Sequence, residues 1–448
     1  MPPLAFPTAP QVCPHNTQPG DQRTCRGGTR TNHGGSPVSR TLKTAAALAA
    51  LSLTVVGCAN SSDTGSSTSG GGSNGNSNLK SLDAQSSLEV PKDAVKAAGD
   101  GKAKCAPGTT IAFIGAMTGD NAQLGINEYQ GVQLAINEHN KANPDCQVTF
   151  KKYDTEGDPT KATGPVTQAV GDKNIIGVVG LPFSGESKAT GAIFEQAGLV
   201  HITPSATNPS LTGNGWKTFF RGLGNDNIQG PAAAILAEKL GAKKVYLVQD
   251  DSDYGIGLGG TAKKALQDKS LLAGEDKVTT KQKDFSSTVQ KIINSKADAV
   301  FFAGYYAEGA PLNQQLVAKG FKGAFIGPDG VKDDQFIKLA GDSSKNAYFT
   351  CPCIPGELIP DFASAYKGVA NAAPGTYSVE SYDAATVLLA GIQKGNTDRP
   401  KLLNFVKSYD GQGLSKKIKW DDKGELSDLA VYGYKVDGGK IVSVGKLG

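Results

Sequence analysis

The stretch Asp284–Val331, DFSSTVQKIINSKADAVFFAGYYAEGAPLNQQLVAKGFKGAFIGPDGV, decides the fold. Within it, the short apolar runs Val300–Ala303 and Ala324–Ile326 indicate strands, and a helix-length segment joins them. The first run ends at Gly304-Tyr305-Tyr306 and the second at Gly327-Pro328-Asp329-Gly330. Two parallel strands joined by one helix bring their carboxyl ends to the same edge of a sheet, where ligands of open α/β sheets bind. The stretch therefore predicts a small-molecule site that contains two tyrosines and one carboxylate.

The same strand–loop–helix pattern repeats on both sides of this stretch. A first cycle predicts strands at 109–114, 147–153, 175–179 and 199–203, alternating with helices at 125–140, 160–170 and 186–196. A second cycle predicts helices at 229–240 and 254–268 and, besides the strands of the opening stretch, strands at 244–249, 277–280 and 347–350. Helices at 361–370, 378–391 and 399–408 follow, and antiparallel strands at 414–419, 430–436 and 441–444 close the chain. Two such cycles predict an α/β protein with two doubly wound, Rossmann-like lobes and a cleft between their strand ends.

Composition gives no case for nucleic-acid binding. The chain has 448 residues and a formal net charge of +4. Five basic residues and one acidic residue lie within residues 1–57, which leaves 41 of each sign in the remainder. Since nucleic-acid binding depends on basic surface, a neutral body gives no electrostatic reason to expect such a partner, and we expect none.

The N-terminal region indicates export. Residues 1–37 are rich in Pro, Gly, Thr and Asn without apolar periodicity, so we expect them to be disordered, and we interpret them as a possible mis-called extension. Residues 38–57 have the features of a signal peptide, because Arg40 and Lys43 precede a run of 14 uncharged, mostly apolar residues at 44–57. This run is shorter than the ~20 residues that a membrane span needs.

The end of this run resembles the lipobox of bacterial lipoproteins. Val55-Val56-Gly57-Cys58 places a small residue before a cysteine, and the resemblance implies that Cys58 is lipidated and anchors the protein in the outer face of the cell membrane. Residues 58–106 would follow as anchor and linker. The Ser/Gly/Asn-rich part, 59–78, would span roughly 25 Å as a flexible coil. A short helix within 79–101 is a further expectation.

A series of ordered blocks in the body resembles a known family. The blocks are Gly115-Ala116-Met117-Thr118-Gly119, Thr203-Pro204-Ser205-Ala206-Thr207-Asn208-Pro209, Gln229-Gly230-Pro231, Asp253-Tyr254-Gly255, Lys283-Asp284-Phe285, Gly304-Tyr305-Tyr306, Gly327-Pro328-Asp329-Gly330-Val331 and Trp420-Asp421-Asp422-Lys423-Gly424. Together they resemble the branched-chain amino-acid-binding proteins, the extracytoplasmic receptors of ABC importers, over residues 109–439. The resemblance implies a type I periplasmic-binding-protein fold with a three-segment hinge. One lobe would comprise 107–224 plus 353–411 and the other 225–352 plus 412–448.

The resemblance also implies which first-lobe residues bind the ligand. Ser184, or its neighbour Phe183, falls in a loop that offers a hydroxyl and a backbone N–H to an α-carboxylate. Ser205 falls where a backbone carbonyl meets the ammonium group, and Thr207 where a hydroxyl and an N–H hold the carboxylate. Neutral donors of this kind satisfy an anion through charge-assisted hydrogen bonds. The alternative for Thr207-Asn208-Pro209 is an ordinary turn.

In the second lobe, Tyr254 and Tyr305 match cleft tyrosines of the family. Asp329 stands where the family usually has Glu, as counter-ion of the ammonium group. Leu124, in the first lobe, stands where some members carry an aromatic residue against the ligand side chain, and an aliphatic residue there suits an apolar substituent. The implied partners are an amino acid, the permease subunits of an ABC importer and the membrane through the lipid anchor. We expect a monomer that is not an enzyme and has no cofactor.

Four cysteines belong to the body of this exported chain. Cys105 precedes the first strand and Cys146 the second, and neighbouring parallel strands start at the same edge, so this pair is a plausible disulfide. Cys351 and Cys353 would then pair across one residue, or stay as free thiols, or bind a metal through their thiols. No metal site is expected, because the body contains only His139 and His201 and neither falls in a ligand spacing.

Two further motifs leave alternatives open. Gly255-Ile256-Gly257-Leu258-Gly259-Gly260 fits G-x-G-x-x-G, but five residues separate it from the preceding strand, so close helix packing is the plainer interpretation. The G-x-S-x-G at 71–75 lies in the linker without a strand or helix around it. The alternatives to an amino-acid receptor are a receptor for a related amide or small carboxylate, a nucleotide-dependent α/β enzyme, and a ligand-sensing domain that signals to a membrane partner.

Overall fold

The computed structural model describes residues 79–447. The expected extension at 1–37, the signal peptide at 38–57, the lipidation site Cys58 and the linker at 59–78 lie outside the described residues. Within 79–447, no helix combines the length and the apolar character that a membrane crossing requires.

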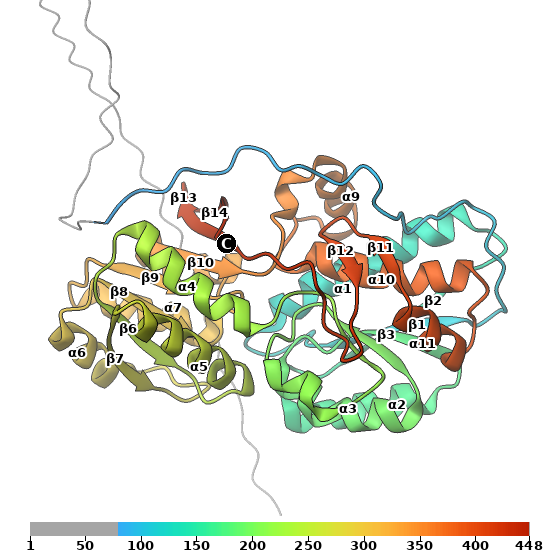
Figure 1. Cartoon of the computed structure of the whole chain (residues 1–448), viewed down its shortest axis with the longest axis horizontal. Coiled ribbons are helices and arrows are strands. Elements are labelled where there is room, and N and C mark those ends of the chain that lie inside the picture. The colour runs from blue at the N-terminus through green and yellow to red at the C-terminus, as the bar shows by residue number, and fades with distance from the viewer. Residues whose placement is uncertain (1–78, 448) are drawn as a thin grey trace, which may run out of the picture. The chain divides into compact units, whose positions relative to one another are not determined.

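The first lobe is built on a purely parallel sheet with strand order β2-β1-β3-β4-β5 (Figure 1). Its strands are β1 (Thr110–Gly115), β2 (Thr149–Asp154), β3 (Ile175–Gly180), β4 (Val200–Thr203) and β5 (Phe219–Arg221). Ala112 and Ile114 of β1 pack with α2 (Pro159–Gly171) and α3 (Ser184–Ala197) on one face. Ile111 and Phe113 pack with α1 (Ala122–Ala142), α10 (Ser378–Gln393) and α11 (Arg399–Lys407) on the other. Apolar residues on both faces of β1 thus give the doubly wound arrangement.

The second lobe has a mixed sheet with strand order β14-β13-β10-β9-β8-β6-β7. Its strands are β6 (Val245–Gln249), β7 (Leu272–Lys277), β8 (Ala299–Ala303), β9 (Ala324–Gly327), β10 (Ala347–Cys351), β13 (Tyr432–Asp437) and β14 (Lys440–Lys446). The five strands from β10 to β7 are parallel, and β13 and β14 add antiparallel at the β10 edge. Helices α4 (Asp226–Leu240) and α5 (Asp253–Asp268) pack on one face with Phe301. Helices α6 (Ser286–Ser295), α7 (Tyr306–Ala318) and α8 (Asp334–Ala340) pack on the other with Phe302.

The hairpin β11 (Asp410–Gln412)–β12 (Lys417–Lys419) packs on the first lobe. The backbone N–H of Leu414 donates to the Asp383 carboxylate of α10 at 2.9 Å. The indole N–H of Trp420, just beyond the hairpin, donates to the Arg221 carbonyl at 2.6 Å. The expected lobe boundary at 411/412 falls within β11, and the division of the chain into lobes at this point stays a prediction. The chain re-enters the second sheet at β13, after α9 (Pro360–Ala370), α10 and α11 have packed on the first lobe.

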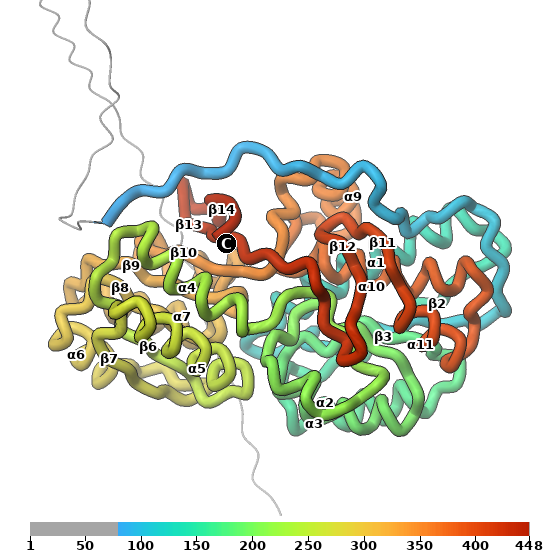
Figure 2. Tube along the Cα trace, viewed as in Figure 1, coloured from blue at the N-terminus to red at the C-terminus, as the bar shows by residue number. Residues whose placement is uncertain are grey.

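Residues 79–106, which we call the strap, run over both lobes before β1 (Figure 2). The strap bonds to the second lobe first, where Gln85 N–H donates to the Ser443 carbonyl at 2.7 Å. It bonds to the first lobe next, where Val95 N–H donates to the Gln412 carbonyl at 2.8 Å. Ala97, with no exposed surface, lies in the first-lobe core. The strap has no helix, so the helix expected within 79–101 is wrong.

Two disulfides are present in the described part of the chain. Cys105 pairs with Cys146, with Cα atoms 4.7 Å apart, at the edge where β1 and β2 begin. Cys351 pairs with Cys353 where the chain leaves β10 for the first lobe. Of the alternatives left open for the second pair, the structure has the disulfide.

Other predicted elements match in type but not always in place. The strand expected at 277–280 lies earlier, as β7, and ends at Lys277. The sequence pattern predicts no element at β5, α6, α8 or β11.

Candidate functional site

A small pocket, which we call the inner pocket, lies where the loops after the strands of the two sheets meet. It is lined by Leu124, Glu128, Pro182, Phe183, Ser184, Ser205, Tyr254, Tyr305, Asp329, Gly330 and Tyr377. Seven of the eight ligand-binding residues predicted from the sequence are in this set, and Thr207 is not. The structure thus brings these seven together, from both lobes, while their roles toward a ligand stay predictions.

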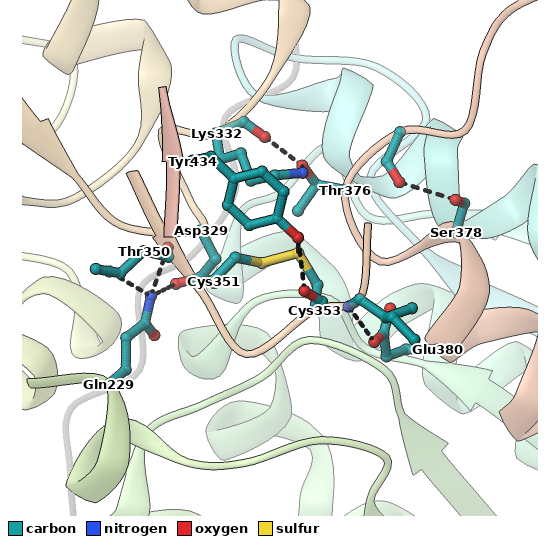
Figure 3. Close-up of a disulfide and its surroundings, with 12 residues drawn as sticks. Gln229, Asp329, Lys332, Thr350, Cys351, Cys353, Thr376, Ser378, Glu380 and Tyr434 are labelled. Atoms are coloured by element: carbon teal, nitrogen blue, oxygen red, sulfur yellow. Dashed lines mark hydrogen bonds between the residues drawn. A yellow bond between two sulfur atoms is a disulfide. The ribbon is translucent and has the colours of Figure 1, made fainter. Parts of the chain in front are cut away.

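Asp329 is the buried carboxyl group that the second lobe presents to the inner pocket. It follows β9 and is only 4% exposed. Its Oδ1 accepts hydrogen bonds from the Tyr254 hydroxyl and from Gln229 Nε2, each at 2.5 Å. Burial raises the pKa of Asp329, and these hydrogen bonds partly offset that shift. Gln229 also donates to the Thr350 carbonyl at 3.1 Å, so it joins Asp329 to the strand that leads into the Cys351–Cys353 hinge crossing (Figure 3).

The first lobe offers hydroxyl groups opposite Asp329. Ser184 begins α3, and its Oγ accepts the Asn208 N–H at 3.2 Å. Ser205 Oγ donates to the Pro182 carbonyl at 2.8 Å. The Thr207 side chain is completely buried, two residues beyond Ser205, and its hydroxyl faces the Asp226 carboxyl group without a hydrogen bond of normal geometry in the described part of the chain.

Arg221 fixes the loop that carries Thr207. Arg221 ends β5 and has no exposed surface. Its guanidinium donates to the Ala206 carbonyl and, at 3.0 Å, to the Asn208 carbonyl. The same group donates to both carboxylate oxygens of Glu425, at 3.0 and 3.1 Å. Arg221 therefore fixes the backbone on both sides of Thr207.

Aromatic rings separate the inner pocket from a larger, polar cavity, which we call the cleft mouth. The rings of Phe183 and Tyr305 meet edge to face with centroids 5.0 Å apart, and Tyr254 lies 5.1 Å from Tyr305. Phe183 and Tyr305 line both cavities. The cleft mouth is acidic, with Asp120, Glu156, Asp158, Asp251, Asp253 and Glu308 among its lining residues. A ligand that passes from the cleft mouth to the inner pocket must move these rings.

The two lobes contact each other directly around the inner pocket. Asn127 of α1 donates to the Asp333 carboxylate at 2.9 Å, and Lys188 forms a 2.6 Å ion pair with Asp253. Asn208 Nδ2 donates to the Asp253 carbonyl at 2.6 Å. The inner pocket therefore lies behind a set of polar contacts that must break before the lobes can open.

The glycine-rich motif at 255–260 lies inside α5. β6 ends at Gln249, so the motif does not form the turn that follows the strand, which a dinucleotide site needs. A Cβ atom on Gly257 would lie 2.7 Å from Nδ2 of Asn208 in the other lobe. This glycine therefore permits the close approach of the two lobes.

Sequence reasoning missed two polar side chains of the inner pocket, Glu128 and Tyr377. Glu128 follows Leu124 by one helical turn of α1, a spacing that places both on one face. Tyr377 immediately precedes α10, far along the chain from the other pocket residues. The helical spacing could have pointed to Glu128, whereas no local signal marked Tyr377.

Glu186 gives the first lobe a testable pH dependence. It is completely buried in the first turn of α3, where its carboxylate accepts the Phe183 N–H at 3.2 Å, and burial raises its pKa to about 7. The pKa of Glu186 is higher in the folded protein than in the unfolded chain. Its contribution to the free energy of unfolding is therefore present at low pH and is lost as pH rises from about 4.5 to 7. Between pH 5.5 and 6.5, Glu186 should lower the unfolding free energy of the unmodified protein by about 1 kcal/mol. The Glu186→Gln variant should not show this part of the decrease.

Denaturant unfolding at the two pH values measures this difference. Glu89→Gln, which removes an exposed carboxylate from the strap, should leave it unchanged. An equal loss in Glu186→Gln and in the unmodified protein would contradict the prediction.

Comparison with known proteins agrees with this geometry. Residues 108–440 match a family model described as periplasmic binding protein. A leucine-, isoleucine-, valine-, threonine- and alanine-binding protein of Pseudomonas aeruginosa is 31% identical over 336 residues, which cover 73% of this chain and 90% of that protein. The Leu/Ile/Val-binding protein of Escherichia coli K12 is 29% identical over 339 residues, covering 73% and 91%.

Solved structures show the same fold. A leucine-binding protein from Thermotoga maritima has a TM-score of 0.67 at 27% identity, with 75% of this chain and 97% of that chain covered. A branched-chain amino-acid transporter substrate-binding protein from Streptococcus pneumoniae, solved with isoleucine, has a TM-score of 0.68 at 26% identity, covering 75% and 99%. The fold and the resemblance predicted from the sequence are thereby confirmed. The chain belongs to the periplasmic binding protein family, among the extracytoplasmic solute receptors that include the Leu/Ile/Val-binding proteins.

Proposed function

We propose that the protein is the solute receptor of an ABC importer, and that it binds the charged groups of a free amino acid in the inner pocket and delivers it to the permease. The observation that carries this proposal is the arrangement across the pocket. Asp329 stands on one lobe, and Ser184, Ser205 and the buried Thr207 hydroxyl stand on the other. An acid facing neutral donors matches an ammonium group facing a carboxylate.

Each end of the amino acid has a proposed partner. The ammonium group would lie against Asp329 and the Ser205 carbonyl, and the carboxylate would receive donors from Ser184 and Thr207. The side chain would contact Leu124, Phe183 and Tyr305. Because these groups come from both lobes, the ligand would hold the lobes together, and its release would require hinge opening.

The cellular setting is proposed on the same basis. The periplasmic binding protein family is extracytoplasmic. The lipobox-like sequence at Cys58 supports a lipid anchor on the outer face of the cell membrane, with a monomeric receptor held on the linker at 59–78. Mass spectrometry of the protein from cells tests the anchor, since Cys58 should be the lipidated N-terminal residue.

Titration calorimetry of the purified protein tests the binding function. We expect leucine, isoleucine, valine, alanine or threonine to bind with a Kd of ~1 μM or below, a free energy of about −8 kcal/mol. NAD should give no heat. Binding only of an amide or a carboxylate that lacks the ammonium group would contradict the role of Asp329, and binding of NAD alone would contradict the receptor function.

A further inference from the structure

Two polar side chains of the inner pocket form no hydrogen bond of normal geometry in the described part of the chain, although Glu128 faces Ser205 and Tyr377 faces Asp329. Glu128 of α1 has no exposed surface, and Tyr377, at the start of α10, is 3% exposed. This holds for both carboxyl oxygens of Glu128 and for the Tyr377 hydroxyl. Both residues line the inner pocket together with Asp329. Buried polar groups without well-formed hydrogen bonds are costly, so this pair calls for a partner that enters the pocket.

The buried cations near the hinge are already engaged elsewhere. Lys416 pairs with Glu380 at 3.0 Å, and Arg221 pairs with Glu425. Lys332 lies 4.2 Å from the centre of the Tyr434 ring and 3.4 Å from the Thr376 hydroxyl. None of these three cations is bonded to Glu128. Ser205, which faces Glu128, already donates its hydroxyl proton to the Pro182 carbonyl, so a ligand group is the partner that could complete the hydrogen bonding of Glu128.

Tyr377 is held at its position at a conformational cost. Its backbone has φ of 65°, in the left-handed region that non-glycine residues rarely adopt. Such strain persists where the surrounding structure fixes it, often in binding sites. Burial, and then the charge of Asp329, raise the pKa of Tyr377 well above its usual range, so the hydroxyl keeps its proton and can donate. Burial likewise raises the pKa of Glu128, and the Ser205 hydroxyl that faces it partly offsets that shift.

Resting on the proposed function, we infer that the preferred ligand is a small amino acid with a hydroxyl group on its β-carbon, and that Tyr377 and Glu128 bind this hydroxyl. The β-hydroxyl is vicinal to the ammonium group, so a ligand whose ammonium lies at Asp329 brings the hydroxyl to the groups beside Asp329. Leu124, one turn before Glu128, supplies the apolar contact for a β-methyl group. Threonine has both substituents, and valine is its isostere with a methyl group in place of the hydroxyl.

Threonine and valine therefore make a matched pair of probes for titration calorimetry with the purified protein. We expect threonine to bind about tenfold more tightly than valine, because a pocket built for a hydroxyl leaves polar groups unpaired around a methyl. Tyr377→Phe removes one oxygen atom and should reduce this ratio about tenfold. Titration of the same variant with alanine, which has neither substituent, measures how far the substitution alters binding of the ammonium and carboxylate groups, and this effect is divided out of the threonine and valine affinities.

Two further variants separate recognition from structure. Glu128→Gln keeps a hydrogen-bond donor and acceptor and should preserve most of the threonine-to-valine affinity ratio. Glu128→Leu, which has neither, should bring this ratio close to one. Tyr366→Phe removes a buried first-lobe hydroxyl outside the inner pocket, where it donates to the Asn127 carbonyl, and should leave the ratio unchanged.

The outcomes are distinguishable. Valine binding as tightly as threonine, or a ratio that Tyr377→Phe does not change, overturns the inference and leaves the amino-acid receptor standing. Failure of every amino acid to bind overturns both the inference and the proposed function.

Discussion

Replacement of Arg221 by methionine is expected to lower the free energy of unfolding by about 3–5 kcal/mol. The substitution keeps much of the buried volume but removes the ion pair with Glu425, whose side chain is only 16% exposed. It also leaves the carbonyls of Ala206 and Asn208 without their donor. Removal of one partner of a buried pair is costly because the other charge stays behind unpaired. Chemical denaturation of the purified variant measures the loss.

The same variant should bind amino acids more weakly, because the two freed carbonyls flank Thr207. Arg399 provides a matched control. It is also buried, and it donates to the backbone carbonyls of Ile175, Val170 and Asp172, away from the inner pocket. Arg399→Met should destabilise the protein while leaving the affinity of the folded fraction unchanged. An Arg221→Met variant as stable as the unmodified protein would contradict the first expectation, and one with unchanged affinity would contradict the second.

Asp329→Asn is expected to weaken amino-acid binding by ~1.5–3 kcal/mol, which is about 10- to 150-fold in Kd. Asparagine has nearly the same shape, so the loss reports the charge that faces the ligand ammonium. Because burial raises the pKa of Asp329, a neutral amide should fold at least as well as the carboxylate, and the variant is expected to keep its stability. Titration calorimetry, with the melting temperature as a check on folding, measures both effects.

Asp120→Asn is the matched control for Asp329→Asn. Asp120 is an exposed acid of the cleft mouth, so its substitution changes the net charge by the same amount without touching the inner pocket. Its Kd should stay within about threefold of the unmodified protein, since exposed charges are screened. Equal changes in Kd for the two substitutions would mean that Asp329 acts only through the net charge of the protein and not as a counter-ion of the ligand ammonium group.

Much of the fold could be predicted from the sequence because the buried parallel strands are continuous apolar runs. β1, β3 and β8 are buried along their whole length and have a clear beginning and end. β7 lies at the sheet edge and is only partly buried, so its sequence LAGEDK has no such run, and the strand was expected in the wrong place. The position of the hairpin β11–β12 depends on contacts of Trp420 and Asp383 with distant parts of the chain, which no local pattern encodes.

The residues of the candidate site also differ in how far they could be predicted from the sequence. Seven predicted residues line the inner pocket because each belongs to a loop or helix start at the carboxyl end of a strand, where the topology alone brings them together. Thr207 does not line that pocket, and its role stays a prediction. Tyr377 reaches the pocket only through the packing of α10 against α1, a contact between segments about 250 residues apart that no local pattern encodes.

The strap sets an upper limit on how far the lobes can separate. Its attachment to β14 is at Gln85 and its attachment to β11 is at Val95, ten residues further along. A fully extended chain of that length reaches roughly 35 Å. As long as both attachments persist, their two attachment points must stay within this distance in any open form. A wider opening requires that the hydrogen bonds between the strap and one lobe break first. The length of the strap between its two attachments, and not only the hinge, thus limits the amplitude of lobe opening.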